Sequence, residues 1–420
     1  MRHVIIGNSA AGVTAAESLR KLQPKAEIII ISDELEHTYS RCLLPDFLSG
    51  ERTAEQLRYR DNDFYKRNRI ETILGQKVTS VETQDEQVVL ADGRRIGYDR
   101  LLVATGASSF MPPIPGLKHV NAFGLRTLAD AENIMAAAET ARNVVIVGGG
   151  FVGLEAAYGL RRRGLDVTVV EMAPQILGLQ LDEKAASILA DDLQGEGVRL
   201  ITGVGVTEIE KPSLWSRLRR APRRVVLANG EKLNADLVIL AIGTRTNVEP
   251  VKDTTIQLNR GILVDNYLET NVSGVFSAGD VAETRDVVTD NIGLSPIWPN
   301  AVVQGRYAAH NMAGQKKSLA GMVSMRNAVE FREVPAIAIG LSKATEADGY
   351  EIITVERPHQ QTYKKLVLKD NRLYGMILVG DIQQAGVLGD LIRNKTDITD
   401  VKDKLLKPGF SHAEILQGCA

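Results

Sequence analysis

Residues 147–155 read Val-Gly-Gly-Gly-Phe-Val-Gly-Leu-Glu, between a strand-like run and a helix-like run. Gly148, Gly150 and Gly153 have the spacing of a dinucleotide-binding turn. The first glycine permits the tight turn, the second lets a pyrophosphate approach the backbone, and the third lets helix and strand pack closely. Because the start of such a helix offers unpaired N–H groups and a partial positive charge to phosphates, this segment predicts a nucleotide-binding unit.

Glu171 stands at the end of the next strand-like run, 18 residues after Gly153. A carboxylate at this position accepts hydrogen bonds from a ribose diol and repels a 2′-phosphate. No arginine occurs between residues 172 and 177 that could bind such a phosphate. We therefore expect the chain to use NADH rather than NADPH.

An imperfect second copy of the unit occupies residues 2–34 and carries Gly7-Asn-Ser-Ala-Ala-Gly12. Ser9 replaces the middle glycine, and its small side chain still leaves room for a phosphate. The strand-like run 28–32 ends at Asp33 and Glu34. Asp33 is our first choice for the ribose acid of this copy, and Glu34 is the second. Two copies of one nucleotide-binding unit predict two bound nucleotides.

Strand-like and helix-like runs alternate along most of the chain, which favours an α/β fold with parallel sheets. Glycines follow further strand-like runs at Thr105-Gly106, Gly243 and Gly279-Asp280, and the proline-rich segment 112–116 is typical of a domain crossover. We expect two Rossmann-like dinucleotide-binding domains and a C-terminal α+β domain. The first would comprise residues 1–112 and 246–318, the second residues 113–245 and the third residues 319–420.

The composition excludes several classes of protein. The 420 residues carry a net charge of −2, which argues against a protein that binds nucleic acid through an overall positive charge. The longest aliphatic runs have the length of a strand, and a strand-like run starts at His3, so we expect neither a transmembrane segment nor a signal peptide. Cys42 and Cys419 are too few for a disulfide framework, which favours the cytoplasm. We expect no metal site.

The order of these motifs resembles the pyridine nucleotide–disulfide oxidoreductase superfamily along the whole chain. The resemblance implies that the first unit and the Gly-Asp motif bind FAD, that the second unit binds NAD(H), and that the C-terminal domain forms a homodimer. The residues so implied for FAD are Gly7, Ser9, Ala11, Gly12, Asp33, Glu34, Arg41, Thr105, Gly106, Gly279 and Asp280, and those for NAD are Gly148, Gly150, Gly153, Glu171 and Gly243. Spacing alone does not decide which unit binds which nucleotide.

At several positions the sequence departs from the motifs of particular branches of the superfamily, which narrows the choice of branch. The CxxxxC pair of the lipoamide and glutathione type is absent after the first unit, and His412 and Glu414 have the wrong surroundings for the acid–base pair of that group. Ala10 stands where the NADH peroxidases and water-forming oxidases carry a histidine. Disulfide reduction by a cysteine pair and peroxide chemistry are therefore not expected.

Two segments point to different acceptors. Tyr39-Ser-Arg-Cys-Leu-Leu-Pro45 is similar to the single-cysteine segment of coenzyme A disulfide reductases, and also to the Tyr-x-Arg segment of NADH–rubredoxin and nitrite reductase flavin domains, which need no cysteine. Trp298-Pro-Asn-Ala-Val-Val-Gln-Gly305 is similar to a segment of oxygenase-coupled ferredoxin reductases, where the tryptophan lies near the flavin on the side of the protein partner. The alternatives are that Cys42 is a small apolar residue packed beside the ring and that Trp298 is a core residue.

The run from Tyr363 to Asp381 also looks like the rubredoxin and nitrite reductase branch. We therefore expect an FAD-dependent NADH oxidoreductase that passes electrons to a small acidic iron–sulfur or rubredoxin-like protein. The alternative is a disulfide or persulfide reductase that uses Cys42. A flavin-binding module without enzymatic activity is a third class, and two complete nucleotide sites argue against it.

The candidate catalytic residues are Cys42, Phe151, Glu155 and Trp298. Phe151 occupies the position of an aromatic gate in similar proteins, where the ring covers the flavin until nicotinamide displaces it. The stretch 211–224 holds six basic residues and no acid between two strand-like runs. It is either a solvated loop or an arm that docks an acidic partner, with an anionic membrane surface as a weaker third option.

Overall fold

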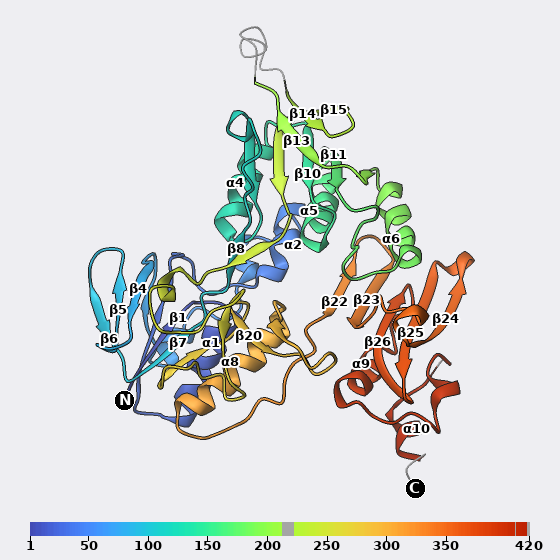
Figure 1. Cartoon of the computed structure of the whole chain (residues 1–420). Coiled ribbons are helices and arrows are strands. Elements are labelled where there is room, and N and C mark those ends of the chain that lie inside the picture. Colours follow the sequence, from blue (N-terminus) through green and yellow to red (C-terminus); the bar gives the residue numbers. More distant parts are fainter. Residues whose placement is uncertain (212–221, 408, 418–420) are drawn as a thin grey trace. The chain divides into compact units, whose positions relative to one another are not determined.

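The computed structural model describes residues 1–211, 222–407 and 409–417, and the chain divides into two compact units. The first unit comprises residues 1–42, 54–108 and 244–324, and the second comprises residues 43–53, 109–243 and 325–420. Each unit is therefore assembled from segments far apart in the sequence, as the chain colours of Figure 1 show. Residues 212–221 of the basic stretch lie outside the described residues.

The first unit is built on a sheet of five parallel strands. In the order of pairing these are β19 (Val275–Ser277), β7 (Arg100–Val103), β1 (Arg2–Ile6), β2 (Glu27–Ile31) and β3 (Glu71–Ile73). Along β2, residues 28 and 30 belong to one buried cluster and residues 29 and 31 to another. Both faces of the sheet are covered, which explains the unbroken isoleucine run of this strand.

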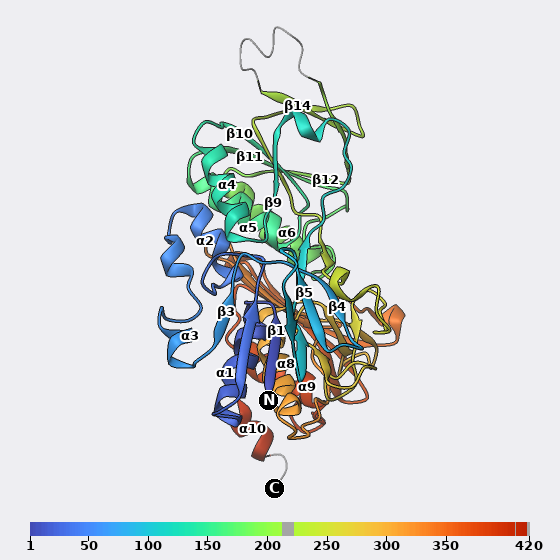
Figure 2. The ribbon, with the colours of Figure 1, turned by 90° about the vertical axis from the view of Figure 1, so that its left-hand side faces the viewer.

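Two different layers cover the faces of this sheet. Helices α1 (Ala10–Leu22) and α8 (Trp298–Met312) pack on one face, and the antiparallel strands β4 (Val78–Glu82), β5 (Gln87–Leu90) and β6 (Arg95–Gly97) pack on the other. Figure 2 shows α1 and the strands β4 and β5 on opposite sides of β1. The smaller elements are α3 (Phe64–Arg67), β18 (Ile262–Leu263), β20 (Ala282–Arg285), β21 (Ile292–Leu294), and the pair of β8 (Ala107–Ser109) and β17 (Thr244–Thr246).

The second unit repeats the parallel sheet around the other Gly-rich turn. Its strands pair in the order β12 (Arg199–Thr202), β11 (Asp166–Glu171), β10 (Asn143–Val147), β16 (Leu237–Leu240) and β9 (Asn121–Gly124). The accompanying elements are α4 (Leu128–Ala138), α5 (Phe151–Arg162), α6 (Glu183–Gly195), and the antiparallel strands β13 (Val206–Ile209), β14 (Arg223–Leu227) and β15 (Lys232–Ala235). Thr127 and Asp130 form a capping box at the start of α4. The expected α/β class with two parallel sheets is thus confirmed.

Two further segments belong to the second unit. Helix α2 (Leu44–Ser49) packs on α5 so closely that a Cβ at Gly159 would lie 3.1 Å from the Pro45 carbonyl oxygen. The C-terminal segment forms an antiparallel sheet in the order β22 (Arg326–Glu330), β23 (Pro335–Gly340), β26 (Arg372–Val379), β25 (Thr362–Lys369) and β24 (Glu351–Arg357), with helices α9 (Ala385–Asn394) and α10 (His412–Gln417). The division into three domains stays a prediction, since the chain separates into only two compact units.

Candidate active site

The first Gly-rich turn joins β1 to α1 in the first unit. Gly7 has a φ of +125°, and a Cβ at this residue would overlap the carbonyl oxygen of Ala104. A Cβ at Gly12 would overlap the carbonyl oxygen of Gly7, so both glycines are required by the geometry of the turn. Ser9 is the N-cap residue of α1, and its hydroxyl makes no capping hydrogen bond.

The other two predicted FAD segments lie at the same edge of this sheet. Thr105-Gly106 follows β7, Gly279-Asp280 follows β19, and the Gly-rich turn follows β1, the neighbour of β7 in the parallel sheet. The carboxyl edge of a parallel sheet is where nucleotides bind in folds of this kind. Gly279 has a φ of +83° and donates its backbone N–H to Oε1 of Gln304 at 2.6 Å.

Glu34 forms a network with two residues of the following segment. Its carboxylate accepts hydrogen bonds from the Tyr39 hydroxyl, at 2.5 Å, and from the Arg41 guanidinium. Burial lowers the pKa of Arg41, but the Tyr39, Glu34 and Asp280 charges more than offset this effect and raise it. Arg41 therefore lies close enough to Asp280 of the Gly-Asp motif for the two charges to interact. Asp33, the first choice from the sequence, is exposed.

Cys42 and Trp298 differ in their surroundings. Cys42 is exposed and lies in the 3-10 turn Arg41–Leu43. Trp298 is the first residue of α8 and is partly buried against the core of the first unit. The Tyr59 ring meets Trp298 edge-on at 5.0 Å between centroids, and Cζ of Arg60 lies 3.9 Å from the Tyr59 centroid. The tryptophan thus belongs to an aromatic cluster that carries a cation.

The second Gly-rich turn, in the second unit, has backbone geometry that requires glycine at two of its positions. Gly148 has a φ of +112°, and a Cβ at Gly153 would overlap the carbonyl oxygen of Gly148. Gly150 is the N-cap residue of α5, and a Cβ built there meets nothing within 4 Å. The space that a pyrophosphate needs is therefore open at the middle glycine. Gly243, after β16, has a φ of +108° and is equally open.

Glu171, the last residue of β11, lies directly against this turn. Its Oε2 accepts the backbone N–H of Gly149 at 2.6 Å, and its Oε1 accepts that of Ala173 at 2.7 Å. These two bonds fix the direction of the carboxylate. The residues predicted to bind the pyrophosphate and the ribose are thus brought together in one structure.

The family model for pyridine nucleotide-disulphide oxidoreductases matches residues 1–305 of the chain. The chain belongs to this family. A second model, that of the rubredoxin NAD+ reductase C-terminal domain, matches residues 332–396. The resemblance read from the sequence is thereby confirmed, including the likeness of its C-terminal run to the rubredoxin reductase branch.

Two relatives illustrate the range of this oxidoreductase family. The chain is 31% identical over 408 residues to the NADH-dependent phenylglyoxylate dehydrogenase subunit epsilon of Aromatoleum evansii. This match covers 96% of the chain and 94% of that subunit. The chain is 29% identical over 411 residues to the assimilatory nitrate reductase electron transfer subunit of Bacillus subtilis. That match covers 98% of the chain but only 51% of the relative, so the chain spans about half of its length.

Two solved structures resemble the whole chain. The covalent complex of putidaredoxin reductase with putidaredoxin matches with a TM-score of 0.88 and 26% identity, over 99% of this chain and 98% of that one. A NAD-dependent persulfide reductase from A. fulgidus matches with a TM-score of 0.85 and 25% identity, over 95% of this chain and 78% of that one. Relatives of both expected kinds, with a protein acceptor and with a persulfide, therefore share this fold.

Members of this oxidoreductase family bind FAD and NAD(H), which confirms the two cofactors expected from the sequence.

The residues of the first unit fit a bound cofactor. His37 Nε2 and Thr38 Oγ1 are buried, and among the described residues neither atom has a hydrogen-bond partner. The hydroxyl of Tyr65 accepts the Thr38 N–H and donates to Asn8 of the first Gly-rich turn, at 2.7 Å. The segment that carries the two unpaired atoms is therefore linked to that turn through Tyr65.

Phe151 and Glu155 belong to the first turns of α5 in this oxidoreductase. Both side chains are partly buried. Burial raises the pKa of Glu155 to about 7, with a smaller contribution from the negative charge of Asp46 on α2. A carboxyl group with such a pKa exchanges its proton near neutral pH.

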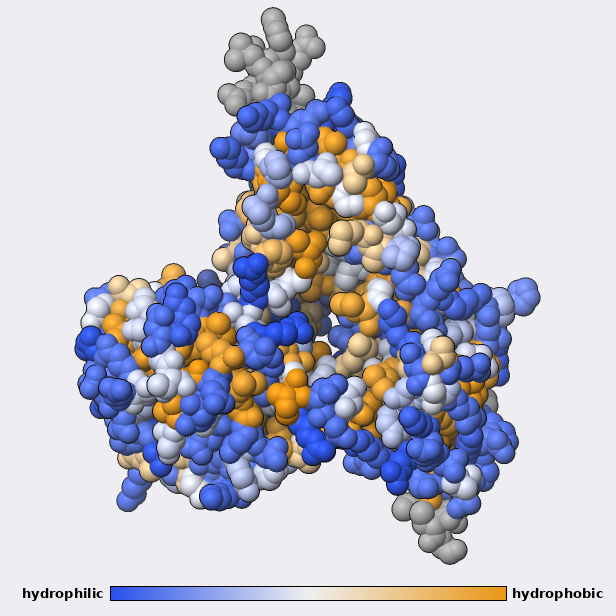
Figure 3. Space-filling model, in the orientation of Figure 1, coloured by the Kyte–Doolittle hydropathy of each residue, from blue (hydrophilic) through white to orange (hydrophobic). Residues whose placement is uncertain are grey.

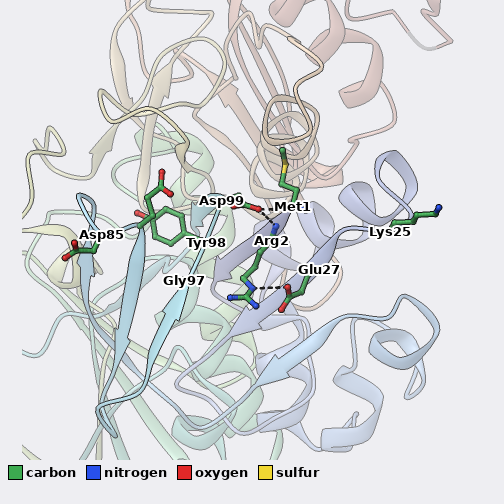
Figure 4. Close-up of a pocket in the computed structure, with 9 residues that line it drawn as sticks. Met1, Arg2, Lys25, Glu27, Asp85, Gly97, Tyr98 and Asp99 are labelled. Atoms are coloured by element: carbon green, nitrogen blue, oxygen red, sulfur yellow. Dashed lines mark hydrogen bonds and ion pairs between the residues drawn. The ribbon is translucent and has the colours of Figure 1, made fainter.

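The hollow at the amino end of β1 does not belong to either nucleotide site. Several charged residues line it, and two of them, Arg2 and Glu27, form an ion pair at 2.9 Å, while the Arg2 N–H donates to Asp99 at 2.6 Å (Figure 4). Nucleotides bind at the opposite, carboxyl edge of such a sheet. Within residues 1–211, 222–407 and 409–417, no three His, Cys, Asp or Glu side chains are grouped as metal ligands would be. No helix in these ranges combines the length and the hydropathy that a membrane span requires.

Hydrophilic side chains cover much of the visible surface in Figure 3, with smaller apolar areas between them. Sequence reasoning gave no role to several residues that the structure places beside the predicted ones: Gln304, Tyr59, Arg60, Tyr65 and Gly149. Gln304 lies inside a segment that had been compared with ferredoxin reductases, so its position offered a signal. Tyr59 and Arg60 offered none, because their contact with Trp298 spans more than 230 residues of sequence.

Proposed function

We propose that this chain is an FAD-dependent NADH oxidoreductase that passes electrons between NAD(H) and a small acidic iron–sulfur or rubredoxin-like protein. The observation that carries the proposal is the cluster of Trp298, Tyr59 and Arg60 at the start of α8. Aromatic residues and arginine are the side chains most enriched where proteins bind one another. A cation in this cluster suits an acidic partner.

The relatives support a protein acceptor. Several are electron-transfer subunits or reductases, including a rubredoxin-NAD(+) reductase of Pseudomonas putida and a dioxygenase ferredoxin–NAD(+) reductase component of Photorhabdus laumondii. The relative that the chain covers over 94% of its length is a subunit of a larger dehydrogenase. The protein that exchanges electrons with this chain could thus be a partner subunit as well as a diffusing carrier.

We assign the donor side to the second unit. The pyrophosphate of NADH would lie over Gly150, where the turn is open, and the N–H groups at the start of α5 would bind it. Glu171 would accept hydrogen bonds from the adenosine ribose and repel a 2′-phosphate. Phe151, one residue after Gly150, would move aside for the nicotinamide.

We assign FAD to the first unit, between the Gly-rich turn and the Gly-Asp motif. When bound there, FAD takes a hydride from NADH and hands the electrons on. Arg41 would neutralise the pyrophosphate charge, and the α1 N-terminus beside Ser9 would donate N–H groups to it. The chain contributes orientation and proximity, while the redox chemistry belongs to the cofactor.

A second candidate function rests on Cys42. The side chain is exposed in the turn that directly follows Arg41, where a disulfide or persulfide substrate could reach it. A thiolate there would attack one sulfur of the substrate's S–S bond, which would break and release the other sulfur as a thiolate or as hydrosulfide. The two electrons that cleave the new S–S bond at Cys42 would come from NADH through the bound FAD. The likeness to a persulfide reductase supports this candidate.

Anaerobic reduction by NADH, followed by each acceptor in turn, tests the two candidates. We expect NADH to bleach the flavin, and an oxidised rubredoxin or [2Fe–2S] ferredoxin to restore its colour. Reoxidation by coenzyme A persulfide or disulfide, without reaction with either protein, would establish the second candidate instead. If NADH fails to bleach the flavin, the protein is a flavin-binding module without enzymatic activity. The homodimer and the cytoplasmic location also remain proposals, which sedimentation and fractionation would test.

A further inference from the structure

The loop that follows Glu171 spans residues 172–182 and connects β11 to α6. It is attached to the Gly-rich turn, because the Leu177 N–H donates to the Gly149 carbonyl oxygen at 2.8 Å. Leu177 is buried and has a φ of +51°, in the left-handed region that a leucine rarely adopts. Such a conformation persists only when the surrounding structure imposes it. The position of this loop is therefore set by its contacts on both sides.

The C-terminal sheet makes the contacts on the other side. The buried hydroxyl of Ser342, just after β23, donates to the Gln180 carbonyl oxygen at 2.7 Å. The ammonium group of Lys343 donates to the carbonyl oxygen of Gly178. Two consecutive residues after β23 thus hold two carbonyl groups of the loop.

Asp182 ends the loop and carries a third attachment. Its Oδ1 accepts the Ala185 N–H at 3.1 Å as the N-cap of α6. Its Oδ2 accepts the Tyr363 hydroxyl at 2.8 Å and lies 3.5 Å from Nζ of Lys365. Both residues of β25 are buried, at 7% and 5% exposure. Burial, and then the bond to Asp182, raises the pKa of Tyr363, so this phenol stays a donor.

Successive side chains of β25 point to opposite faces, so a second buried lysine lies on the face away from Asp182. Tyr363 and Lys365 share one face of the strand, and Lys364 lies on the other. There the Lys364 ammonium contacts Asp381 at 2.7 Å and Gln384 at 2.9 Å, both within the C-terminal segment. Because a buried ammonium is stable only with such partners, each lysine ties β25 to a different part of the unit.

We propose that the C-terminal sheet sets the affinity for NADH by holding the loop 172–182, with Tyr363 and Lys365 as positioning residues that act through Asp182. The inference rests on the proposed binding of NADH at the second Gly-rich turn. Displacement of the loop would move Leu177 and hence Gly149. Since Gly149 also holds the carboxylate of Glu171, the pyrophosphate and ribose contacts would weaken together.

The test compares two buried lysines of one strand. In Lys365→Met the dissociation constant for NAD+, measured by titration calorimetry on the FAD-loaded protein, should rise about 5- to 10-fold, within the range typical of coupling between two sites. Hydrogen exchange should quicken at residues 172–182. The matched control Lys364→Met removes the same charge from the other face and should leave both quantities unchanged. At saturating NADH, the reduction rate of Lys365→Met should stay within about 2-fold of wild type, because the attachment acts on binding.

Tyr363→Phe removes one hydroxyl and keeps the shape of the side chain, so it tests the attachment if Lys365→Met does not fold. An unchanged dissociation constant in a folded Lys365→Met or Tyr363→Phe protein would overturn the inference, as would an equal rise in Lys364→Met. Wild-type protein that binds no NAD+ would overturn the proposed function itself, and the wild-type titration alone shows this. The two failures are therefore distinguishable.

Discussion

The backbone N–H of Gly149 donates a 2.6 Å hydrogen bond to Oε2 of Glu171, which joins the second Gly-rich turn to the acid at the end of β11. The contact is close on the side-chain side as well, since a Cβ at Gly149 would lie 3.0 Å from Cβ of Glu171. Two backbone N–H groups, those of Gly149 and Ala173, thus hold the carboxylate in one direction. A preformed acceptor of this kind lowers the cost of ordering on binding.

The choice of nucleotide should follow the charge of Glu171. Wild-type protein should have a higher kcat/KM with NADH than with NADPH, because the carboxylate repels the 2′-phosphate. Glu171→Gln removes the charge and keeps the shape, so the NADH-to-NADPH ratio of kcat/KM should fall by about 10-fold or more, as expected for an electrostatic term above 1.4 kcal/mol. A wild-type ratio at or below one would show that the assignment is wrong.

Glu155 should make stability depend on pH. Its pKa in the folded chain, about 7, lies above the ordinary value of 4.5, so protonation of this group stabilises the folded state. That stability is fully present below pH 4.5 and is lost as the pH rises through 7. Glu155→Gln should therefore gain up to about 3 kcal/mol relative to wild type between pH 5 and pH 8, since one pKa unit corresponds to about 1.4 kcal/mol.

Thermal midpoints of Glu155→Gln and wild type at pH 5 and pH 8 measure this gain. Glu139→Gln, which replaces an exposed acid at the end of α4, is the control and should follow wild type at both values. If the two midpoints of Glu155→Gln shift in parallel with those of wild type, Glu155 is ionised in the folded protein at neutral pH.

The sequence predicts best what depends on local backbone geometry. The two Gly-rich turns could be located because Gly7 and Gly148 take positive φ values that favour glycine wherever they occur. The parallel sheets follow from runs such as residues 28–31, whose side chains are apolar on both faces.

What the sequence could not predict depends on distant partners. Lys364 and Lys365 have the polar character of an exposed strand, yet both are buried because Asp381 and Asp182 supply their counterions. Asp182 is 183 positions away from Lys365, and no spacing rule connects them. The grouping of residues 43–53 with the second unit likewise depends on the packing of α2 against α5.

Cys42→Ser should separate the two candidate functions. If a protein is the acceptor, NADH-dependent reduction of ferredoxin or rubredoxin should stay within about 2-fold of wild type, because the flavin passes its electrons to such a protein without a thiol. If Cys42 is the reactive group, turnover of a persulfide or disulfide should be lost. A long-wavelength charge-transfer band in the wild-type spectrum that the serine variant lacks would identify a thiolate beside the flavin and favour the second function.

Arg60 should control the encounter with an acidic protein acceptor. Its guanidinium is fixed over the Tyr59 ring and by Glu17, at 3.0 Å, so the positive charge has a defined position beside Trp298. Opposite charges raise association rates, and salt screens them over about 10 Å at 0.1 M ionic strength. Arg60→Gln should therefore slow the reduction of a ferredoxin-like acceptor several-fold at low salt and much less at high salt. Trp298→Ala should slow the same reaction at both ionic strengths, because a contact residue is lost rather than a charge.

The control for these variants is Arg95→Gln. Arg95 lies on β6, in the sheet that covers the opposite face of the first unit from α8, and its side chain is 54% exposed. The substitution Arg95→Gln removes the same charge from the chain and should leave the rate of acceptor reduction unchanged at both ionic strengths. Reduction of ferricyanide should be normal in all three variants, since a small acceptor needs no docking surface. Equal slowing of the protein and of ferricyanide in Arg60→Gln, or the same salt response in Arg95→Gln, would show that this cluster does not bind the acceptor.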